Sequence, residues 1–126
     1  MTALQSGAGR YRPTAALMVL EAASLAAASA LHLSSLVHGH GAAFTETGAG
    51  IAEAVIGLVL LTGAVTLARR GTAGRSAALT ATGFAIAGFI YGLSLTVRAG
   101  DVPDITYHAT VLPLLVATLI LILRAK

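Results

Sequence analysis

The sequence predicts an all-α polytopic membrane protein, a single domain over residues 1–126 that folds as a four-transmembrane-helix bundle. Two observations of composition predict this class. Hydrophobic residues make up 56% of the chain and charged residues only 10%, whereas about a quarter of the residues in a soluble domain are charged. The mean hydropathy of +0.86 also indicates that lipid, more than water, surrounds the protein.

Composition and motifs exclude several classes of function. Lysine and arginine flank the apolar runs and do not cluster on one face, so we expect no nucleic-acid partner. The chain has no cysteine, which rules out disulfides, thiolate metal sites and cysteine nucleophiles. No serine-nucleophile motif or glycine-rich phosphate loop suggests a hydrolase or an ATPase.

Four apolar runs each approach the roughly 20 residues that a helix needs to cross the hydrocarbon of a bilayer. The first follows a polar leader, Met1 to Pro13, and is too long for the apolar part of a signal peptide, so we expect it to be retained. A polar segment that includes His38 and His40 separates the first run from the second. The predicted spans cover about residues 14–37, 48–68, 76–97 and 105–123.

Short polar turns connect the later spans. A tight basic turn at residues 69–71 ends the second span. Gly100 and Pro103 end the third helix and begin the fourth. Either Asp101 or Asp104 can cap the fourth helix, and Pro103 suits its first turn.

The arginine and lysine residues predict the orientation of the bundle. In a four-span arrangement only Arg98 lies on one side, and seven basic residues lie on the other: Arg10, Arg12, Arg69, Arg70, Arg75, Arg124 and Lys126. Cytoplasmic loops are enriched in basic residues. We therefore expect both termini on the cytoplasmic side of the cytoplasmic (inner) membrane, with the histidine-rich and acidic loops outside.

Ionisable side chains within spans are functional candidates because a charge inside the bilayer is costly. At about 1.5 Å per residue, His32, Glu53 and His108 lie at similar depths near the outer ends of three spans, and Tyr91 lies at that depth in the third. Inward-facing residues at one level of a bundle are where ligand sites form. We predict that these four side chains line one pocket, with Glu53 facing at least one histidine.

Three functions are compatible with this pattern. In the first, the pocket binds a transition metal ion, haem or a quinone-like ligand: His32, Glu53 and His108 are the metal ligands, and Tyr91 or Tyr107 contacts the ligand. In the second, Glu21 and Glu53 exchange protons in a small transporter, and in the third the chain is an accessory or assembly subunit of a larger membrane complex.

Structural roles for the same residues stay open. Either histidine could extend to the lipid headgroups, or pair with Glu53 in a structural ion pair. Glu21 could be a hydrogen-bonded residue between helices, with Ser24 or Thr66 as its partner.

Gly88 and Gly92 lie four residues apart in the third span, a spacing that allows close approach of a neighbouring backbone. We expect this contact to be intramolecular. A homo-oligomer, or contact with a membrane-protein partner through the same two glycines, is the alternative.

Overall fold

A computed structural model describes residues 2–34 and 46–125 of the chain, and within these ranges the protein is helical with no strand. The all-α prediction is therefore confirmed for the described residues. The segment with His38 and His40 lies outside them. The elements are α1 (Thr2–Leu33), α2 (Glu46–Arg70), the short 3₁₀ helix η1 (Gly71–Gly74), α3 (Arg75–Ala99) and α4 (Val102–Arg124).

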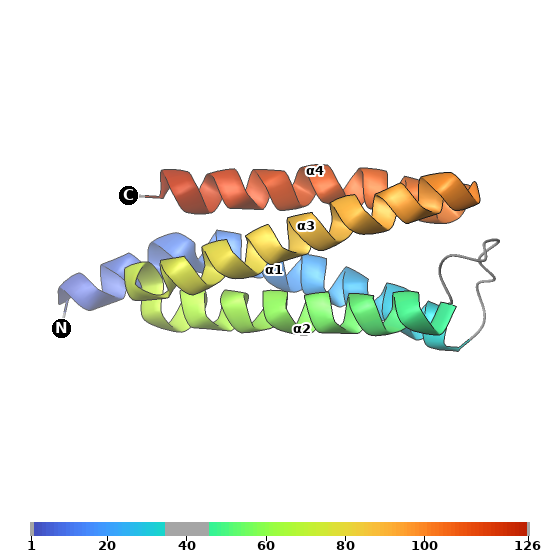
Figure 1. Ribbon diagram of the computed structural model, residues 1–126. Helices are drawn as coiled ribbons and strands as arrows, with labels where there is room; N and C mark the ends of the chain where they lie inside the picture. Colours follow the sequence, from blue (N-terminus) through green and yellow to red (C-terminus); the bar gives the residue numbers. More distant parts are fainter. Residues whose placement is uncertain (1, 35–45, 126) are drawn as a thin grey trace.

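Three stretches of the described chain are long and apolar enough to cross a membrane: Gly9–Leu33, Glu46–Ala99 and Val102–Arg124. The middle stretch contains both α2 and α3, which lie side by side after the chain reverses at η1 (Figure 1). Each of these helices has 25 residues, a length of about 37 Å at 1.5 Å per residue. Length and composition thus support a multi-pass membrane protein with three or four spanning helices.

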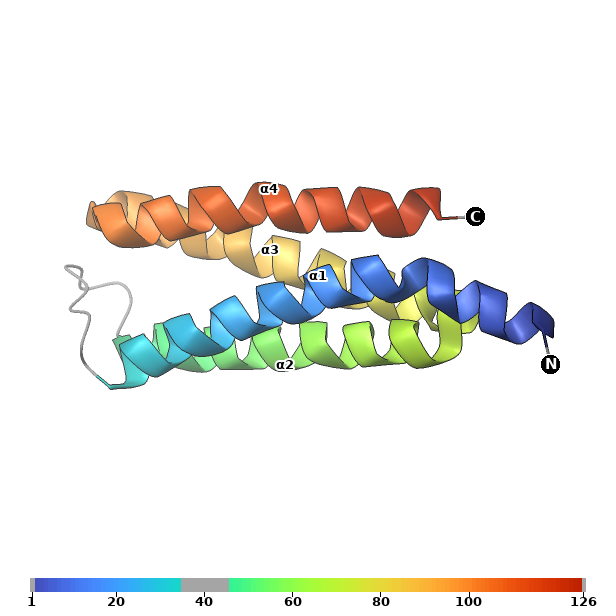
Figure 2. The same ribbon diagram turned by 180° about the vertical axis from the view of Figure 1, so that it is seen from behind.

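The helices form a bundle in which α1 and α3 lie between α2 and α4, as both views of the molecule show (Figures 1 and 2). The N-terminus, the C-terminus and η1 lie at one end, which we call the termini end. The α3–α4 turn, the C-terminus of α1 and the N-terminus of α2 lie at the other, which we call the far end. The far end holds the candidate site.

Helix α1 begins at Thr2, well before the first predicted span at about residue 14, so the polar leader is also helical and Pro13 lies inside the helix. A proline removes the hydrogen bond to the carbonyl group four residues earlier. That residue is Gly9, which is exposed, so its carbonyl group can find other partners. The early start also brings Tyr11 to the bundle, where its side chain is buried.

Two side chains at the termini end bind the last carbonyl groups of α4. The hydroxyl group of Tyr11 donates to the Ala125 carbonyl oxygen at 3.0 Å. Arg75 donates from Nε to the Ile122 carbonyl oxygen at 3.0 Å and from Nη2 to that of Leu123 at 2.6 Å. These bonds satisfy carbonyl groups that a helix leaves without internal partners at its end.

The α3–α4 turn follows the sequence prediction. Gly100 takes a left-handed conformation with φ of 72° and its N–H donates to the carbonyl groups of Thr96 and Val97, ending α3. Asp101 caps α4 by accepting a hydrogen bond from the N–H of Asp104 at 3.3 Å. Pro103 lies in the first turn. This turn sets the position of Asp104 at the far end.

Gly88 and Gly92 both pack within the chain, as predicted. A Cβ atom on Gly88 would lie 2.6 Å from Cδ1 of Ile56 on α2, and one on Gly92 would lie 2.5 Å from Nε2 of His108 on α4. The two glycines therefore serve intramolecular contacts with two different helices. Their alternative use in self-association or partner contact gains no support.

We expect Gly92→Leu to destabilise the protein, because the new side chain would overlap the imidazole of His108. Overpacking of this kind costs about 1–3 kcal/mol. Gly83→Leu is the matched control, since a Cβ atom at that exposed position of α3 meets no other atom within 4 Å. Thermal unfolding in detergent should show a lower midpoint for Gly92→Leu alone, and equal midpoints for the two variants would contradict this packing.

Candidate functional site

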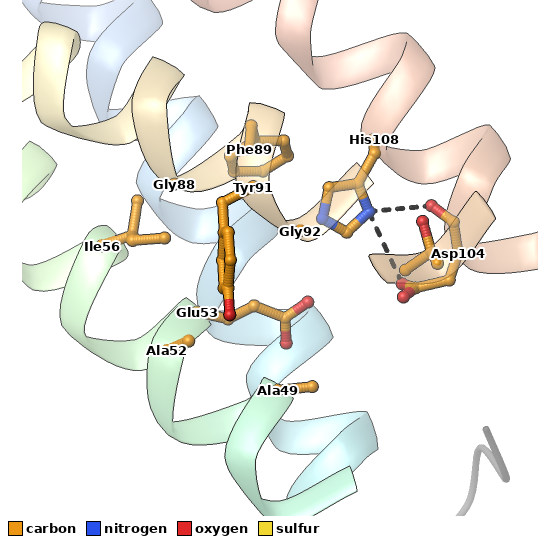
Figure 3. A pocket seen from close by; sticks show the side chains of 11 residues that line it. Ala49, Ala52, Glu53, Ile56, Gly88, Phe89, Tyr91, Gly92, Asp104 and His108 are labelled. Atoms are coloured by element: carbon orange, nitrogen blue, oxygen red, sulfur yellow. Dashed lines mark hydrogen bonds and ion pairs between the residues drawn. The ribbon is translucent and has the colours of Figure 1, made fainter. Parts of the chain in front are cut away.

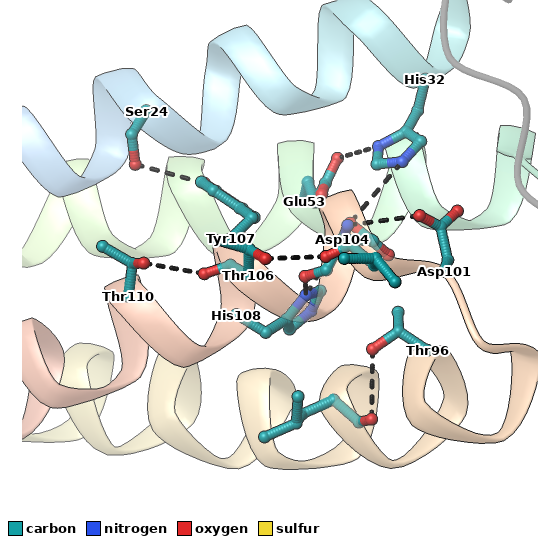
Figure 4. A network of polar contacts seen from close by, with 12 residues as sticks. Ser24, His32, Glu53, Thr96, Asp101, Asp104, Thr106, Tyr107, His108 and Thr110 are labelled. Carbon is teal, nitrogen blue, oxygen red and sulfur yellow. Dashed lines mark hydrogen bonds and ion pairs between the residues drawn. The ribbon is translucent and has the colours of Figure 1, made fainter.

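His32 lies between two carboxyl groups at the far end (Figure 4). Its Nδ1 is 2.8 Å from Oε2 of Glu53, and its Nε2 is 3.9 Å from Oδ1 of Asp104. The three side chains come from three helices: the last turn of α1, the middle of the first half of α2 and the first turn of α4. All three are mostly buried, with exposed fractions of 11%, 9% and 14%.

The helix termini favour this arrangement. Asp104 lies in the first turn of α4, where the helix dipole stabilises a negative charge, and His32 lies in the last turn of α1, where it stabilises a positive one. Glu53 has no such support, and His32 is its hydrogen-bonding partner. The predicted pairing of Glu53 with a histidine is thus present in the structure.

The predicted metal set differs from the observed group in one member. Ligand atoms of His32, Glu53 and Asp104 all lie within 4.8 Å of one another, and His108 is not part of this group. Instead, Nδ1 of His108 donates to the backbone carbonyl of Asp104 at 2.9 Å. Asp104 was expected only as a possible helix cap. Its position four residues before His108 places both on one helix face, which is the signal that could have identified it.

A cavity of about 110 Å³ lies beside this group, between α2, α3 and α4 (Figure 3). Glu53, Asp104 and His108 line it, and so does Tyr91, as predicted. Tyr91 is 64% exposed and therefore stands at the mouth of the cavity. His32 is not a lining residue; it holds Glu53 from the α1 side. Of the four predicted pocket residues, Glu53, Tyr91 and His108 line the cavity, whereas His32 belongs only to the group that it forms with Glu53 and Asp104.

Tyr107, predicted to contact a ligand, points away from the cavity toward α1. Its hydroxyl group lies 3.2 Å from Oγ of Ser24 (Figure 4). Because Ser24 already donates its proton to the Glu21 carbonyl oxygen at 2.8 Å, Tyr107 is the donor in this pair. Its ring packs against Phe89 and His108, with centroid distances of 5.8 and 5.9 Å. Tyr107 therefore packs against the His108 ring without lining the cavity.

Glu21 lies deeper in the bundle and contacts α4. Thr118 donates from Oγ1 to Oε1 of Glu21 at 2.7 Å, and both side chains are buried. Oε2 is buried with no hydrogen-bonding partner among the described residues. The expected partners were wrong: Ser24 binds the main chain of Glu21, and Thr66 donates to the Thr62 carbonyl oxygen.

The chemistry of the group at the far end fits a metal ion better than haem. One imidazole and two carboxylates form a mixed nitrogen and oxygen set that suits zinc and similar divalent ions. Haem held by two histidines needs them on opposite faces of a porphyrin, whereas His32 and His108 both lie next to Asp104. The cavity of about 110 Å³ is also too small for a porphyrin.

No protein-family model, no curated protein and no solved structure matches the chain. The geometry of the far end therefore carries the functional interpretation.

Proposed function

We propose that this small multi-pass membrane protein binds a divalent transition metal ion, with Zn²⁺ as the ion that its ligands suit best. His32, Glu53 and Asp104 are the proposed ligands. The observation that carries the proposal is that three helices bring these ligand atoms within 4.8 Å of one another in a mostly buried setting. Zinc sites with three protein ligands from histidine and carboxylates keep a fourth position open.

A small adjustment of side chains would convert the observed group into a metal site. Ligand atoms about 2.0–2.2 Å from a tetrahedral ion lie about 3.3–3.6 Å from one another. His32 can bind the ion through only one nitrogen, and the one ligand atom that each of the three residues offers lies within 4.8 Å of the other two, so the ligand atoms would have to approach one another by at most about 1.5 Å. His32 and Glu53 share a hydrogen bond in the structure. A metal ion bound to the same two atoms would displace its proton, so metal binding should release a proton.

The fourth ligand of the ion can come from the cavity. Glu53 and Asp104 line the cavity and also belong to the proposed ligand set. The ion would therefore lie at the inner wall of the cavity, with its open position directed there. Water or a polar group of a bound molecule could occupy that position.

We expect Zn²⁺ to bind the purified, chelator-treated protein with a stoichiometry of one in a calorimetric titration. Asp104→Asn should weaken binding by more than about tenfold, since even loss of a group that only supports a ligand costs 10–100-fold. Asp101→Asn is the matched control: it changes a neighbouring aspartate outside the ligand group, and asparagine caps a helix as well as aspartate does. Equal loss in both variants, or no Zn²⁺ binding to the unaltered protein, would refute the site.

We also propose four spans with both termini in the cytoplasm. The basic residues near η1 and near the two termini support this orientation, because these parts lie at the same end of the bundle (Figure 1). Among the described residues only Arg98 is a basic residue of the far end that carries a permanent charge. In this orientation the proposed metal ligands lie at the outer side of the inner membrane.

Reporter proteins fused after Lys126 and inserted between Gly71 and Gly74 should both report a cytoplasmic location, because basic residues concentrate there. The matched position is Gly100, in the α3–α4 turn, which should report the outer side. An outer location for either of the first two reporters would contradict the four-span arrangement.

Proton exchange through Glu21 is a second candidate function. It is favoured by Oε2 of Glu21, which is buried with no hydrogen-bonding partner among the described residues. A charged carboxylate with one hydrogen bond is costly at this depth. We therefore expect Glu21 to hold a proton, as a proton-coupled transporter requires. No feature of the described residues favours the accessory-subunit hypothesis over these two.

A hydrophobic carbodiimide tests this candidate because it reacts with protonated carboxyl groups in apolar surroundings. We expect mass spectrometry to find its adduct on Glu21, and Glu21→Gln to abolish that adduct. Glu53→Gln serves as the control and should leave labelling of Glu21 intact. An unlabelled Glu21 in the folded protein would argue against proton exchange at this residue.

A further inference from the structure

The cavity beside the proposed metal ligands His32, Glu53 and Asp104 has apolar walls and a polar inner end (Figure 3). Its walls come from α2 and α3 and consist largely of small and apolar residues: Ala49, Ala52, Ile56, Gly88, Phe89 and Gly92. Its polar end holds Glu53 and His108, which are only 6% and 8% exposed. A space of this kind binds molecules that are apolar over most of their surface and carry a polar group at one end.

Hydrogen bonding at the polar end selects a donor. The carbonyl of Asp104 can only accept, so Nδ1 of His108 carries a proton and donates it. In the neutral imidazole, Nε2 is then an acceptor, and it points toward Gly92 and the cavity (Figure 3). Among the described residues, neither Nε2 of His108 nor Oε1 of Glu53 takes part in a hydrogen bond. The polar end therefore presents acceptors.

The mouth of the cavity opens sideways between α2 and α3. Ala52 and Tyr91, which line the cavity, are both exposed. Their exposed neighbours Ile51, Val55 and Ile90 are apolar. In a chain that spans a membrane these residues face acyl chains, so a ligand would enter from the lipid and not from water.

The volume limits what can enter. A buried apolar cavity of about 150 Å³ accommodates benzene, and this cavity of about 110 Å³ is open at its mouth. One six-membered ring therefore fits, with any substituent extending through the mouth. The rings of Phe89 and Tyr91 offer aromatic contacts to such a ring.

We infer that this cavity binds a lipid-soluble phenolic ring, such as a hydroquinone-type head group, whose hydroxyl donates to Nε2 of His108 or to Glu53. The oxidised, quinone form of the predicted quinone-like ligand fits less well, because its carbonyl groups need donors. The inference does not depend on the proposed metal site, since His108 is not a metal ligand there. A bound ion at Glu53 and Asp104 would lie beside the hydroxyl group.

The test uses the full chain in lipid nanodiscs and 4-propylphenol as the probe, titrated calorimetrically in the presence of a metal chelator. Two matched probes separate the contributions: 4-propylanisole keeps the ring but lacks the donor, and heptan-1-ol keeps the donor but lacks the ring. We expect one phenol per chain above the background of empty nanodiscs. The ether should bind about three- to tenfold more weakly, the loss of one buried hydrogen bond.

Two substitutions test the location. Ala52→Leu would block the mouth at an exposed position and should abolish phenol binding, whereas Ala54→Leu, on another exposed part of α2, should not. His108→Phe keeps a ring beside Phe89 but removes the acceptor, and should weaken phenol binding about three- to tenfold without changing the preference for a ring. Unchanged binding in Ala52→Leu would overturn the inference.

The remaining outcomes also support or overturn the inference. Equal affinity for the phenol and its ether would overturn recognition of the hydroxyl, and equal affinity for heptan-1-ol would overturn recognition of the ring. Phenol binding that persists in His32→Ala supports the inference even if Zn²⁺ fails to bind, so the two proposals fail separately. Phenol binding that occurs only with Zn²⁺ present and is lost in the chelator would overturn recognition by the cavity's own acceptors.

Discussion

Glu53 imposes the constraint on which the far end depends. A carboxylate exposed to lipid costs several kcal/mol, on the order of 2.5–3.5 kcal/mol even on the lenient translocon scale for aspartate. The structure keeps it buried beside His32, which is itself held between Glu53 and Asp104. These two contacts of His32 thus link α1 with α2 and with α4 at the end where the chain also builds its cavity.

Polar contacts also explain how α4 stays attached to the bundle. Only 28% of the apolar core segment of α4 is buried, against 39% for the corresponding segment of each of the other two stretches. Apolar packing therefore contributes least to holding α4. Side-chain hydrogen bonds or ion pairs join α4 to the other helices at four levels: Asp104 with His32, Tyr107 with Ser24, Thr118 with Glu21, and its last carbonyl groups with Arg75 and Tyr11. In an apolar solvent such bonds replace part of the missing hydrophobic drive between helices.

The sequence predicts what depends on chain-local chemistry. Apolar runs, Gly100 and the Asp101 cap placed the later helices, and matched depth brought Glu53 together with His32. What it missed depends on helix rotation and on pairing across the bundle. Thr118 is 97 residues from Glu21, and no local pattern links them. The helical structure of the polar leader was not predicted because its composition shows no apolar run, and the helix passes through Pro13, where the freed carbonyl is exposed.

Gly92 connects the packing of the bundle with the chemistry of the site. The absence of a side chain at this position lets the His108 ring lie against α3, with Nε2 next to the cavity. The helix carbonyl of Asp104 then fixes the proton on Nδ1. Any larger residue would push the ring away from α3 and move the acceptor, and it would also displace the helix turn that carries Asp104. A glycine that reads as a helix-packing residue in the sequence is therefore also a residue that orients a binding group.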